Sequence, residues 1–415
     1  MKPWPSPYVP AVPGSSPPLR LYAASAGAVE PVVLGPTVRM YVCGITPYDA
    51  THIGHAATYV TFDVVRRSLH DAGRQVVHVQ NVTDVDDPLL ERAQRDGVSW
   101  ADLAEREVAL FGEDMTALGV LAPDHYVGVV ESMGTIVEAV AALEASGAAY
   151  RLAVPGGPGE DVYFDLASSA SFGEVSGWTR EQMAEVFADR GGDPDRPGKR
   201  DPFDPLLWLA ARPGEPAWEA GVLGRGRPGW HVECSAIALR HLGMGFDIQG
   251  GGTDLIFPHH EMSAVQAEGL TGHPPFARHY VHQSMVGLHG EKMSKSQGNL
   301  VLVSRLRADG VEPMAIRLAL LAHHYRTPWD WTEDLLATAV AQRERWREGL
   351  SVNAGPDAAA TVAAVRERVA DDLDTPGALA AVDAWVQRCL AEGGDDPAAP
   401  GLVSRTVDRV LGIRL

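Results

Sequence analysis

Cysteine is scarce in this sequence, which has only three in 415 residues: Cys43, Cys234 and Cys389. Three are too few for a framework of disulfide bonds, so each must be a ligand, a nucleophile or a core residue. No apolar run approaches the roughly 18 residues that a membrane-spanning helix needs. The proline-rich residues 1–18 also lack the charged and then apolar pattern of a secretion signal. These absences predict a cytoplasmic protein that does not contact a membrane.

Basic residues are few relative to acidic ones. The 35 lysines and arginines against 54 aspartates and glutamates give a formal net charge of −19. Proteins that neutralise many phosphates usually present a basic face. The charge therefore argues weakly against a large nucleic-acid partner, although it does not exclude a local basic groove.

Residues 21–123 alternate between short apolar runs and helical patterns. Residues 39–44 predict a strand that ends in a glycine turn, residues 53–69 predict a helix that Gly73 ends, and residues 76–79 predict a second strand. A strand, a crossover helix and a strand within about 40 residues form the βαβ unit of a parallel sheet. We therefore expect an α/β fold.

The rest of the chain predicts an insertion that interrupts this sheet and then a region of helices alone. A helical run and loops rich in glycine and proline fill residues 126–195, and the strand pattern resumes at residues 205–208 and 246–249. After about residue 312 the patterns are helical. The expected segments are a flexible or polyproline-like arm at 1–20, the first half of the sheet domain at 21–125, a connective insertion at 126–195, its second half at 196–290, a linking region at 291–330 and a helical domain at 331–415.

A short histidine motif, His52-Ile53-Gly54-His55, lies at the start of the first expected helix. The backbone N–H groups and the dipole of a helix N-terminus attract phosphate, Gly54 permits close approach, and the imidazoles can add hydrogen bonds. Two surface histidines that cap a helix are the alternative. For an isolated motif of this kind the capping interpretation is favoured.

A second motif, Lys292-Met293-Ser294-Lys295-Ser296, precedes a glycine and an asparagine. Two lysines on a glycine-flanked loop suit a pyrophosphate whose negative charge increases as it leaves. An exposed basic loop is the alternative, and for this motif alone it is favoured.

A third group consists of Cys43, Cys234 and His259. Thiolate and imidazole ligands suit zinc. Their wide spacing matches no small zinc finger, so the fold would have to assemble the site. Two buried cysteines and a polar histidine are the alternative, and the spacing alone slightly favours it.

Taken together, the motifs resemble cysteinyl-tRNA synthetase, a family of class I aminoacyl-tRNA synthetases whose signatures HIGH and KMSKS stand here in the same order. The resemblance extends from about Leu21 to about Leu390, and it rests on residues 41–46, 52–55, 81–87, 229–235, 250–254 and 292–296. It implies a Rossmann-like class I catalytic fold, ATP as a substrate together with Mg²⁺, and a zinc ion that binds the thiolate of cysteine.

The same resemblance implies roles for individual residues. Zinc would be held by Cys43, Cys234 and His259, while His52, His55, Lys292 and Lys295 would stabilise charge on the phosphates. Residues expected to contact cysteine or the adenylate are Cys43, Gly44, Ile45, Thr46, Thr58, Asn81, Val82, Thr83, Trp230, Gly252, Thr253, Asp254 and Val286. Zinc has a physical reason here, because an ordinary pocket rejects serine, a near-isostere of cysteine, only weakly. Cys389 matches no ligand position and is expected in a helix core.

Two features depart from the synthetase pattern. Ser263 stands where the synthetases have a glutamate that is the fourth zinc ligand, so three protein ligands and an open position for the substrate sulfur are expected. No basic segment suited to an anticodon follows residues 371–376. Together with residues 47–51 and 189–194, these features resemble a paralogous family of ligases.

That ligase family uses the same cysteinyl adenylate in mycothiol biosynthesis but transfers the acyl group to the amine of glucosaminyl-inositol. The resemblance therefore implies an AMP-forming ligase whose substrates are L-cysteine, ATP and glucosaminyl-inositol, with no tRNA partner. A short cysteinyl-tRNA synthetase is the alternative. A non-catalytic binding paralogue is disfavoured because no signature residue is lost.

Overall fold

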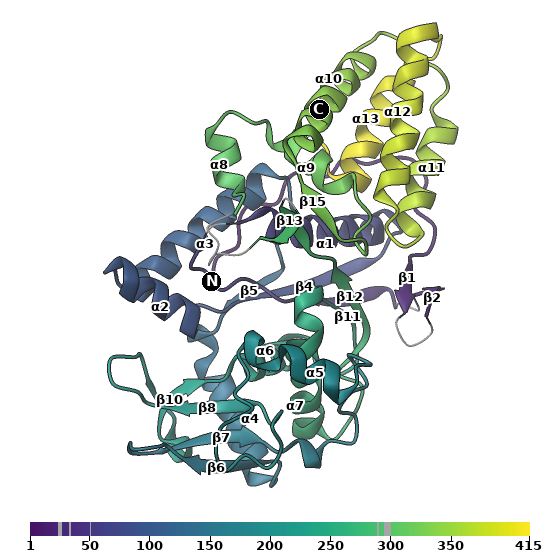
Figure 1. Ribbon diagram of the computed structural model, residues 1–415. Helices are drawn as coiled ribbons and strands as arrows, with labels where there is room; N and C mark the ends of the chain where they lie inside the picture. The colour runs from purple at the N-terminus through teal and green to yellow at the C-terminus, as the bar shows by residue number, and fades with distance from the viewer. Residues whose placement is uncertain (24–26, 33–34, 50, 289, 294–299) are drawn as a thin grey trace.

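The computed structural model describes residues 1–23, 27–32, 35–49, 51–288, 290–293 and 300–415. Its centre is a five-stranded parallel sheet with the strand order β12-β11-β3-β4-β5. The strands are β12 (Ala277–Gln283), β11 (Phe246–Gly252), β3 (Thr37–Val42), β4 (Gln75–Val82) and β5 (His125–Gly128). Helix α1 (Ile53–Asp71) covers one face, and α6 (Trp230–Leu242) with α7 (Glu261–Thr271) lies on the other (Figure 1). The expected α/β class is confirmed.

Helix α1 forms where its apolar spacing predicted it. The apolar positions of the pattern, including Ile53, Val60 and Leu69, are buried against the sheet. The helix ends at Asp71, and Gly73 follows with a φ of 77°, a conformation that glycine adopts without steric cost. Sequence periodicity was sufficient here because the local pattern and the tertiary packing agree.

The inserted segment builds a second sheet, which is antiparallel and has the order β6-β7-β8-β10-β9. Its strands are β6 (Ala149–Ala153), β7 (Glu160–Phe164), β8 (Leu206–Ala210), β10 (Arg225–Pro228) and β9 (Trp218–Glu219). The expectation that residues 205–208 resume the parallel sheet is therefore wrong, because β8 pairs with β7. Trp208 on β8 is fully buried beside Val162, so its apolar run fits either sheet and only tertiary packing selects the partner.

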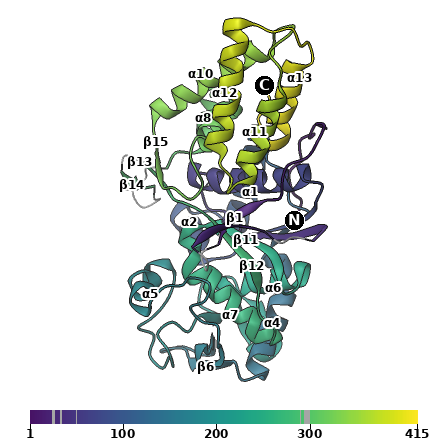
Figure 2. The same ribbon diagram turned by 90° about the vertical axis from the view of Figure 1, so that its right-hand side faces the viewer.

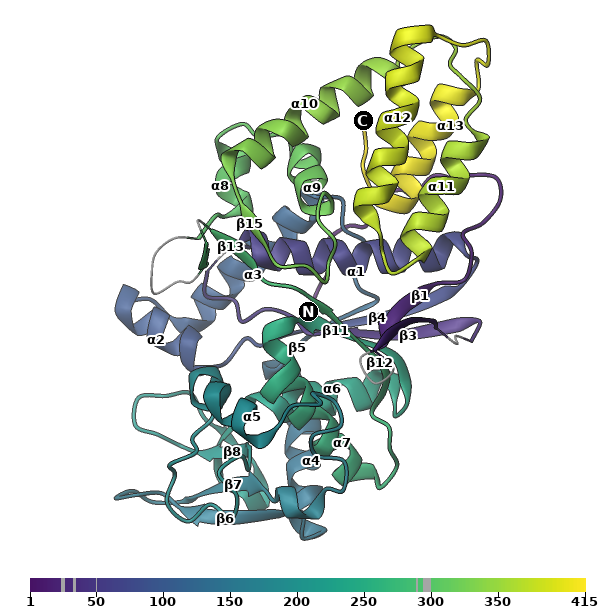
Figure 3. The same cartoon turned by 45° about the vertical axis from the view of Figure 1, so that its right-hand side comes forward.

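Helices surround this second sheet and join it to the first. They are α4 (Met133–Ala145), α5 (Arg180–Phe187), α6 and α7, and they lie below the parallel sheet in Figure 3. Between β4 and the insertion, the chain forms α2 (Asp87–Asp96) and α3 (Trp100–Ala117). The domain limits given above stay a prediction.

The C-terminal part is helical, as expected. This part also contains a three-stranded sheet of β13 (Val286–Leu288), β14 (Glu291–Lys292) and β15 (Trp329–Trp331). Its helices are α8 (Val303–Ala308), α9 (Pro313–Leu321), α10 (Glu333–Leu350), α11 (Ala359–Ala370), α12 (Thr375–Glu392) and α13 (Ala399–Thr406), and the last four stand together above α1 (Figure 2). Cys389 is buried within α12. Among the described residues no helix is long and apolar enough to cross a membrane.

The N-terminal arm has no regular element before β1 (Arg20–Ala23), which pairs with β2 (Ala28–Pro31). It is nevertheless packed: the buried Trp4 donates from Nε1 to the Val120 carbonyl at 2.9 Å. Further along, Ser16 donates to Asp71 in α1 at 2.7 Å. The arm therefore lies along the protein instead of extending as a flexible tail.

A buried cluster of charges connects α1 to the C-terminal helices. The Asp63 carboxylate accepts from Arg67 Nε at 2.7 Å and also pairs with Arg317 of α9, and all three side chains are almost completely inaccessible. Burial raises the pKa of Asp63, but the two arginines outweigh this and hold the pKa below its usual value. Arg317 also donates to the Leu411 carbonyl at 2.7 Å.

Asp63→Ala is expected to lower the free energy of unfolding by about 3–5 kcal/mol, because it leaves two buried guanidinium groups without their carboxylate. Denaturant unfolding would measure this. Asp309→Ala removes an exposed partner of Arg305 and should change stability little. Equal effects of the two substitutions on the free energy of unfolding would contradict a stabilising role of the buried Asp63 carboxylate.

Candidate active site

A cavity of about 460 Å³ opens at the carboxyl ends of the parallel strands. Ligands of open α/β sheets bind at this edge, because the loops that follow the strands converge there. The cavity is lined by the predicted site residues Cys43, Gly44, Ile45, Thr46, His52, His55, Thr58, Trp230, Gly252, Asp254 and Val286. The structure thus brings together residues from both halves of the sheet domain.

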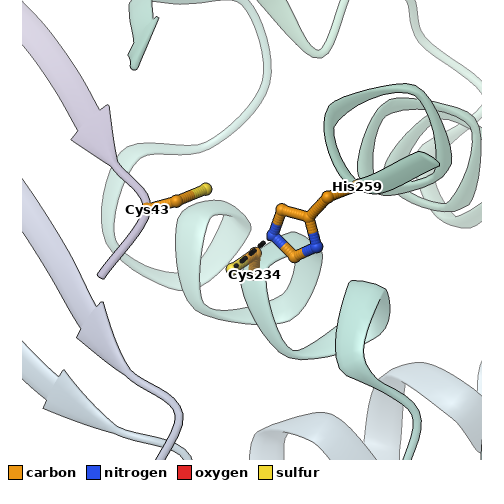
Figure 4. A group of neighbouring side chains, drawn as sticks. All are labelled: Cys43, Cys234 and His259. Carbon is orange, nitrogen blue, oxygen red and sulfur yellow. Dashed lines mark hydrogen bonds between the residues drawn. The ribbon is translucent and has the colours of Figure 1, made fainter. Parts of the chain in front are cut away.

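Three separate segments bring possible metal ligands together (Figure 4), and one of these residues, Cys43, also lines the cavity. Cys43 directly follows β3, Cys234 lies on α6, and His259 lies in the turn that follows β11. Their ligand atoms lie within 4.8 Å of one another, and all three residues are buried. His259 Nε2 is 3.2 Å from Cys234 Sγ. Two thiols and an imidazole at these separations could hold one metal ion.

The two cysteines differ electrostatically. Burial raises the pKa of the Cys43 thiol well above its usual value, and the neighbouring Cys234 raises it further. Burial also opposes ionisation of Cys234, but Cys43 and His259 outweigh it and hold the pKa of that thiol well below its usual value. The lowered pKa favours the thiolate form of Cys234, which is the form that binds metals.

Ser263 is hydrogen-bonded to the backbone of α6. Its hydroxyl donates to the His231 carbonyl at 3.2 Å, and its own carbonyl accepts from Ser235 at 2.9 Å. The side chain is thus engaged with the backbone of α6. The expectation of three protein ligands stays a prediction.

The structure supports the capping interpretation of the first motif through His52, and the phosphate interpretation stays a prediction. The Nδ1 atom of His52 caps α1, since it accepts from the Gly54 N–H at 3.1 Å and the His55 N–H at 3.4 Å. The two rings stack with their centroids 3.7 Å apart, and both line the cavity. Capping holds the His52 imidazole at the positive end of a 19-residue helix, where an anion is favoured.

The second motif is described only in part. Lys292 ends β14, and Met293 lines the cavity. Lys295 lies outside the described residues, as do the rest of residues 294–299. The predicted roles of both lysines stay predictions.

Asn81, Val82 and Thr83 lie behind the cavity wall. Asn81 Oδ1 accepts from the Gly44 N–H at 2.8 Å. A Cβ atom at Gly44 would lie 1.6 Å from the Asn81 carbonyl oxygen, so only glycine permits this approach. Val82 is fully buried core, and Thr253 lies in a short turn after β11 and does not line the cavity.

Several cavity residues were not predicted. They are Tyr48, Tyr59, Leu255, Gln283, Ser284, Met285 and Leu300, whereas Gly54 and Met293, which also line the cavity, belong to the two predicted motifs. Tyr59 follows His55 by one turn of α1, so helical periodicity from the motif could have identified it. Residues 283–285 come at the end of β12, a strand for which the sequence offered no motif.

Comparisons with known proteins also relate this chain to class I tRNA synthetases. The family described as "tRNA synthetases class I (C) catalytic domain" matches residues 30–341. A protein of Gordonia bronchialis named L-cysteine:1D-myo-inositol 2-amino-2-deoxy-alpha-D-glucopyranoside ligase is 61% identical over 413 residues, which cover 100% of this chain and 99% of that protein. The protein of the same name from Streptomyces griseus is 60% identical and covers 100% of both chains.

Solved structures show the same fold at low identity. Mycobacterium tuberculosis methionyl-tRNA synthetase bound by methionyl-adenylate superposes with a TM-score of 0.64 at 16% identity, and the match covers 91% of this chain and 92% of that one. The expected class I catalytic fold is therefore confirmed.

Proposed function

The chain belongs to the family of class I (C) tRNA synthetase catalytic domains, and we infer that it is an ATP-dependent ligase acting on L-cysteine. It joins cysteine to the amine of glucosaminyl-inositol with formation of an amide, a step of mycothiol biosynthesis. The observation that carries this conclusion is the full-length identity of about 60% to ligases of that name. The tRNA synthetase alternative is not favoured.

We propose zinc as the metal of the Cys43, Cys234 and His259 cluster. Burial, the donor set and the close approach of the ligand atoms support it. When bound, zinc would supply a site for the substrate sulfur that prefers thiolate to the hydroxyl of serine. The chain's own contribution is to hold the three ligands rigidly, because each comes from a buried strand end, helix or turn.

In the first half-reaction the cysteine carboxylate attacks the α-phosphorus of ATP and pyrophosphate leaves. His52 and His55, at the N-terminus of α1, are proposed to stabilise phosphate charge together with Lys292 and Lys295. Gly252, Asp254 and Val286 line the same cavity and are proposed to contact the adenosine. Thr46, Thr58 and Trp230 are proposed to shape the cysteine pocket.

In the second half-reaction the sugar amine attacks the acyl carbon of cysteinyl adenylate, AMP leaves, and the amine loses a proton as the amide forms. Holding the amine and the cysteinyl adenylate side by side supplies much of the rate enhancement of this step. We propose an amino sugar and not tRNA as the acceptor. The net charge of −19 and the backbone-bonded Ser263 support this choice.

The second half-reaction tests the proposed function. Purified enzyme given L-cysteine, ATP and glucosaminyl-inositol should produce AMP and an amide, measured by mass spectrometry, and ribonuclease treatment should make no difference. Enzyme that charges tRNA with cysteine and leaves the amino sugar unchanged would establish the synthetase instead.

A further inference from the structure

Arg190 of the inserted segment reaches the turn that connects β11 to α7. Its Nη1 nitrogen donates to the Asp254 carbonyl at 2.8 Å and to the Phe257 carbonyl at 2.5 Å. A guanidinium nitrogen of this kind carries two hydrogens, so it can serve both carbonyls. Arg190 belongs to residues 189–194, whose resemblance to the ligase family the proposed mechanism leaves without a role. The arginine thus joins two backbone positions of one turn.

This turn carries residues of the active site. Asp254 and Leu255 line the cavity, and the proposed metal ligand His259 follows Phe257 by two residues. The Phe257 backbone is extended, with φ −136° and ψ 134°, inside an otherwise helical stretch. An extended residue interrupts the regular hydrogen bonding of a helix, so carbonyls beside it need other donors. Arg190 supplies such a donor.

The inserted segment also surrounds the side chain of Phe257, which is fully buried. Its ring centroid lies between 5.9 and 6.5 Å from those of four aromatic residues between β7 and β8, namely Phe172, Trp178, Phe187 and Phe203. Such separations are typical of favourable aromatic pairs. Beyond the turn, the Glu261 carboxylate accepts from the N–H groups of Gly173 at 2.8 Å and Ser176 at 2.7 Å. The segment therefore holds the turn at several points, and Arg190 is its donor to the part nearest the cavity.

The chain that follows Arg190 is itself held in place. A Cβ atom at Gly192 would lie 2.5 Å from the Phe187 ring, so glycine is needed for this packing. Asp193 accepts from the Tyr163 hydroxyl at 2.5 Å. Phe187 and Tyr163 are each no more than 2% exposed. Because the backbone at Arg190 is fixed before any substrate binds, its guanidinium group is preorganised for the two carbonyls.

We propose that Arg190 is a positioning residue for the binding of ATP. By holding the carbonyls of Asp254 and Phe257 it keeps the turn in the one arrangement that presents Asp254 and Leu255 to the cavity. Among the residues that the structure describes, Arg190 is not part of the cavity lining, so it acts through the turn. The proposal rests on the proposed function, since Asp254 contacts adenosine only if the cavity binds ATP.

Arg190→Met keeps a long unbranched side chain and removes its donors. It should raise KM for ATP in ATP–pyrophosphate exchange by about 10- to 100-fold, the usual effect of losing hydrogen bonds to a charged group. KM for cysteine should change less than about twofold, because Thr46, Thr58 and Trp230 lie on other segments. Zinc content should equal that of the wild type, since the His259 ring also stacks on Trp230 with centroids 4.3 Å apart.

Two further variants separate positioning from a general structural role. Arg190→Lys keeps one nitrogen with several N–H donors on a side chain that is shorter by one atom, so its KM for ATP should lie between those of the wild type and Arg190→Met. Asp254→Ala should also raise KM for ATP. Adding Arg190→Met to it should raise KM little further, because residues that act through one another are non-additive.

Arg200→Met is the matched control for the loss of an arginine from the same segment. The Arg200 side chain is 57% exposed and pairs with Asp165 at 2.5 Å, away from the turn. This variant should keep the KM values of the wild type for both substrates.

Equal changes of KM for ATP and cysteine, additive effects with Asp254→Ala, or a lysine variant as impaired as the methionine variant would each overturn the positioning role. Loss of zinc from Arg190→Met would overturn it too, because the arginine would then support the metal site. If Arg190→Met does not fold, a raised KM for ATP alone in Arg190→Lys supports the role, and wild-type constants overturn it. A wild-type enzyme without cysteine-dependent exchange would instead refute the proposed function.

Discussion

Cys234→Ala is expected to slow cysteine-dependent ATP–pyrophosphate exchange by about 1,000-fold or more, since a metal contributes several kcal/mol at the centre that it contacts. The wild-type protein should contain about one zinc ion per chain and the variant almost none, because two ligands rarely retain the metal. Cys43→Ala should behave in the same way. Elemental analysis and the exchange assay measure the two quantities on the same preparation.

The third cysteine provides the control for this prediction. Cys389 is buried in α12, in the C-terminal helical part and outside the metal cluster, so Cys389→Ala should keep both zinc and exchange activity. A wild-type enzyme that is fully active without metal would contradict the proposed cofactor. Zinc retained by Cys234→Ala would contradict the ligand assignment.

Lys292→Ala and Lys295→Ala should each slow adenylate formation by about 100-fold or more, the usual cost of removing one contact to charge that develops in a transition state. Cysteine binding should change much less, because contacts made mainly in the transition state act on rate and not on ground-state affinity. Single-turnover measurement of adenylate formation separates the two quantities.

Lys2→Ala, a change at an exposed residue of the N-terminal arm, is the matched control for the loss of a positive charge. It should have the rate of the wild type. Unchanged pyrophosphate exchange in both motif variants would show that neither lysine acts on the leaving group. Because the roles of Lys292 and Lys295 were inferred from the sequence motif, this experiment tests that inference directly.

Features that depend on nearby residues could be predicted from the sequence. Helix α1 is one, because its apolar spacing, its histidine cap and Gly73 all lie within one short segment. The fold class followed from a local strand–helix–strand pattern, and the site motifs followed from their resemblance to one family. The roles predicted for the site residues stay predictions, although the structure places most of them around one cavity.

The sequence by itself determined which side chains are available: two cysteines and a histidine for a metal, two histidines at a helix start, and lysines for phosphate. Only the tertiary structure decided which of them meet. Cys43, Cys234 and His259 come within 4.8 Å because a strand end, a helix and a turn converge, and no spacing along the chain encodes that convergence. The pairing of β8 with β7 was likewise decided by packing, since an apolar strand can satisfy several partners until the fold selects one.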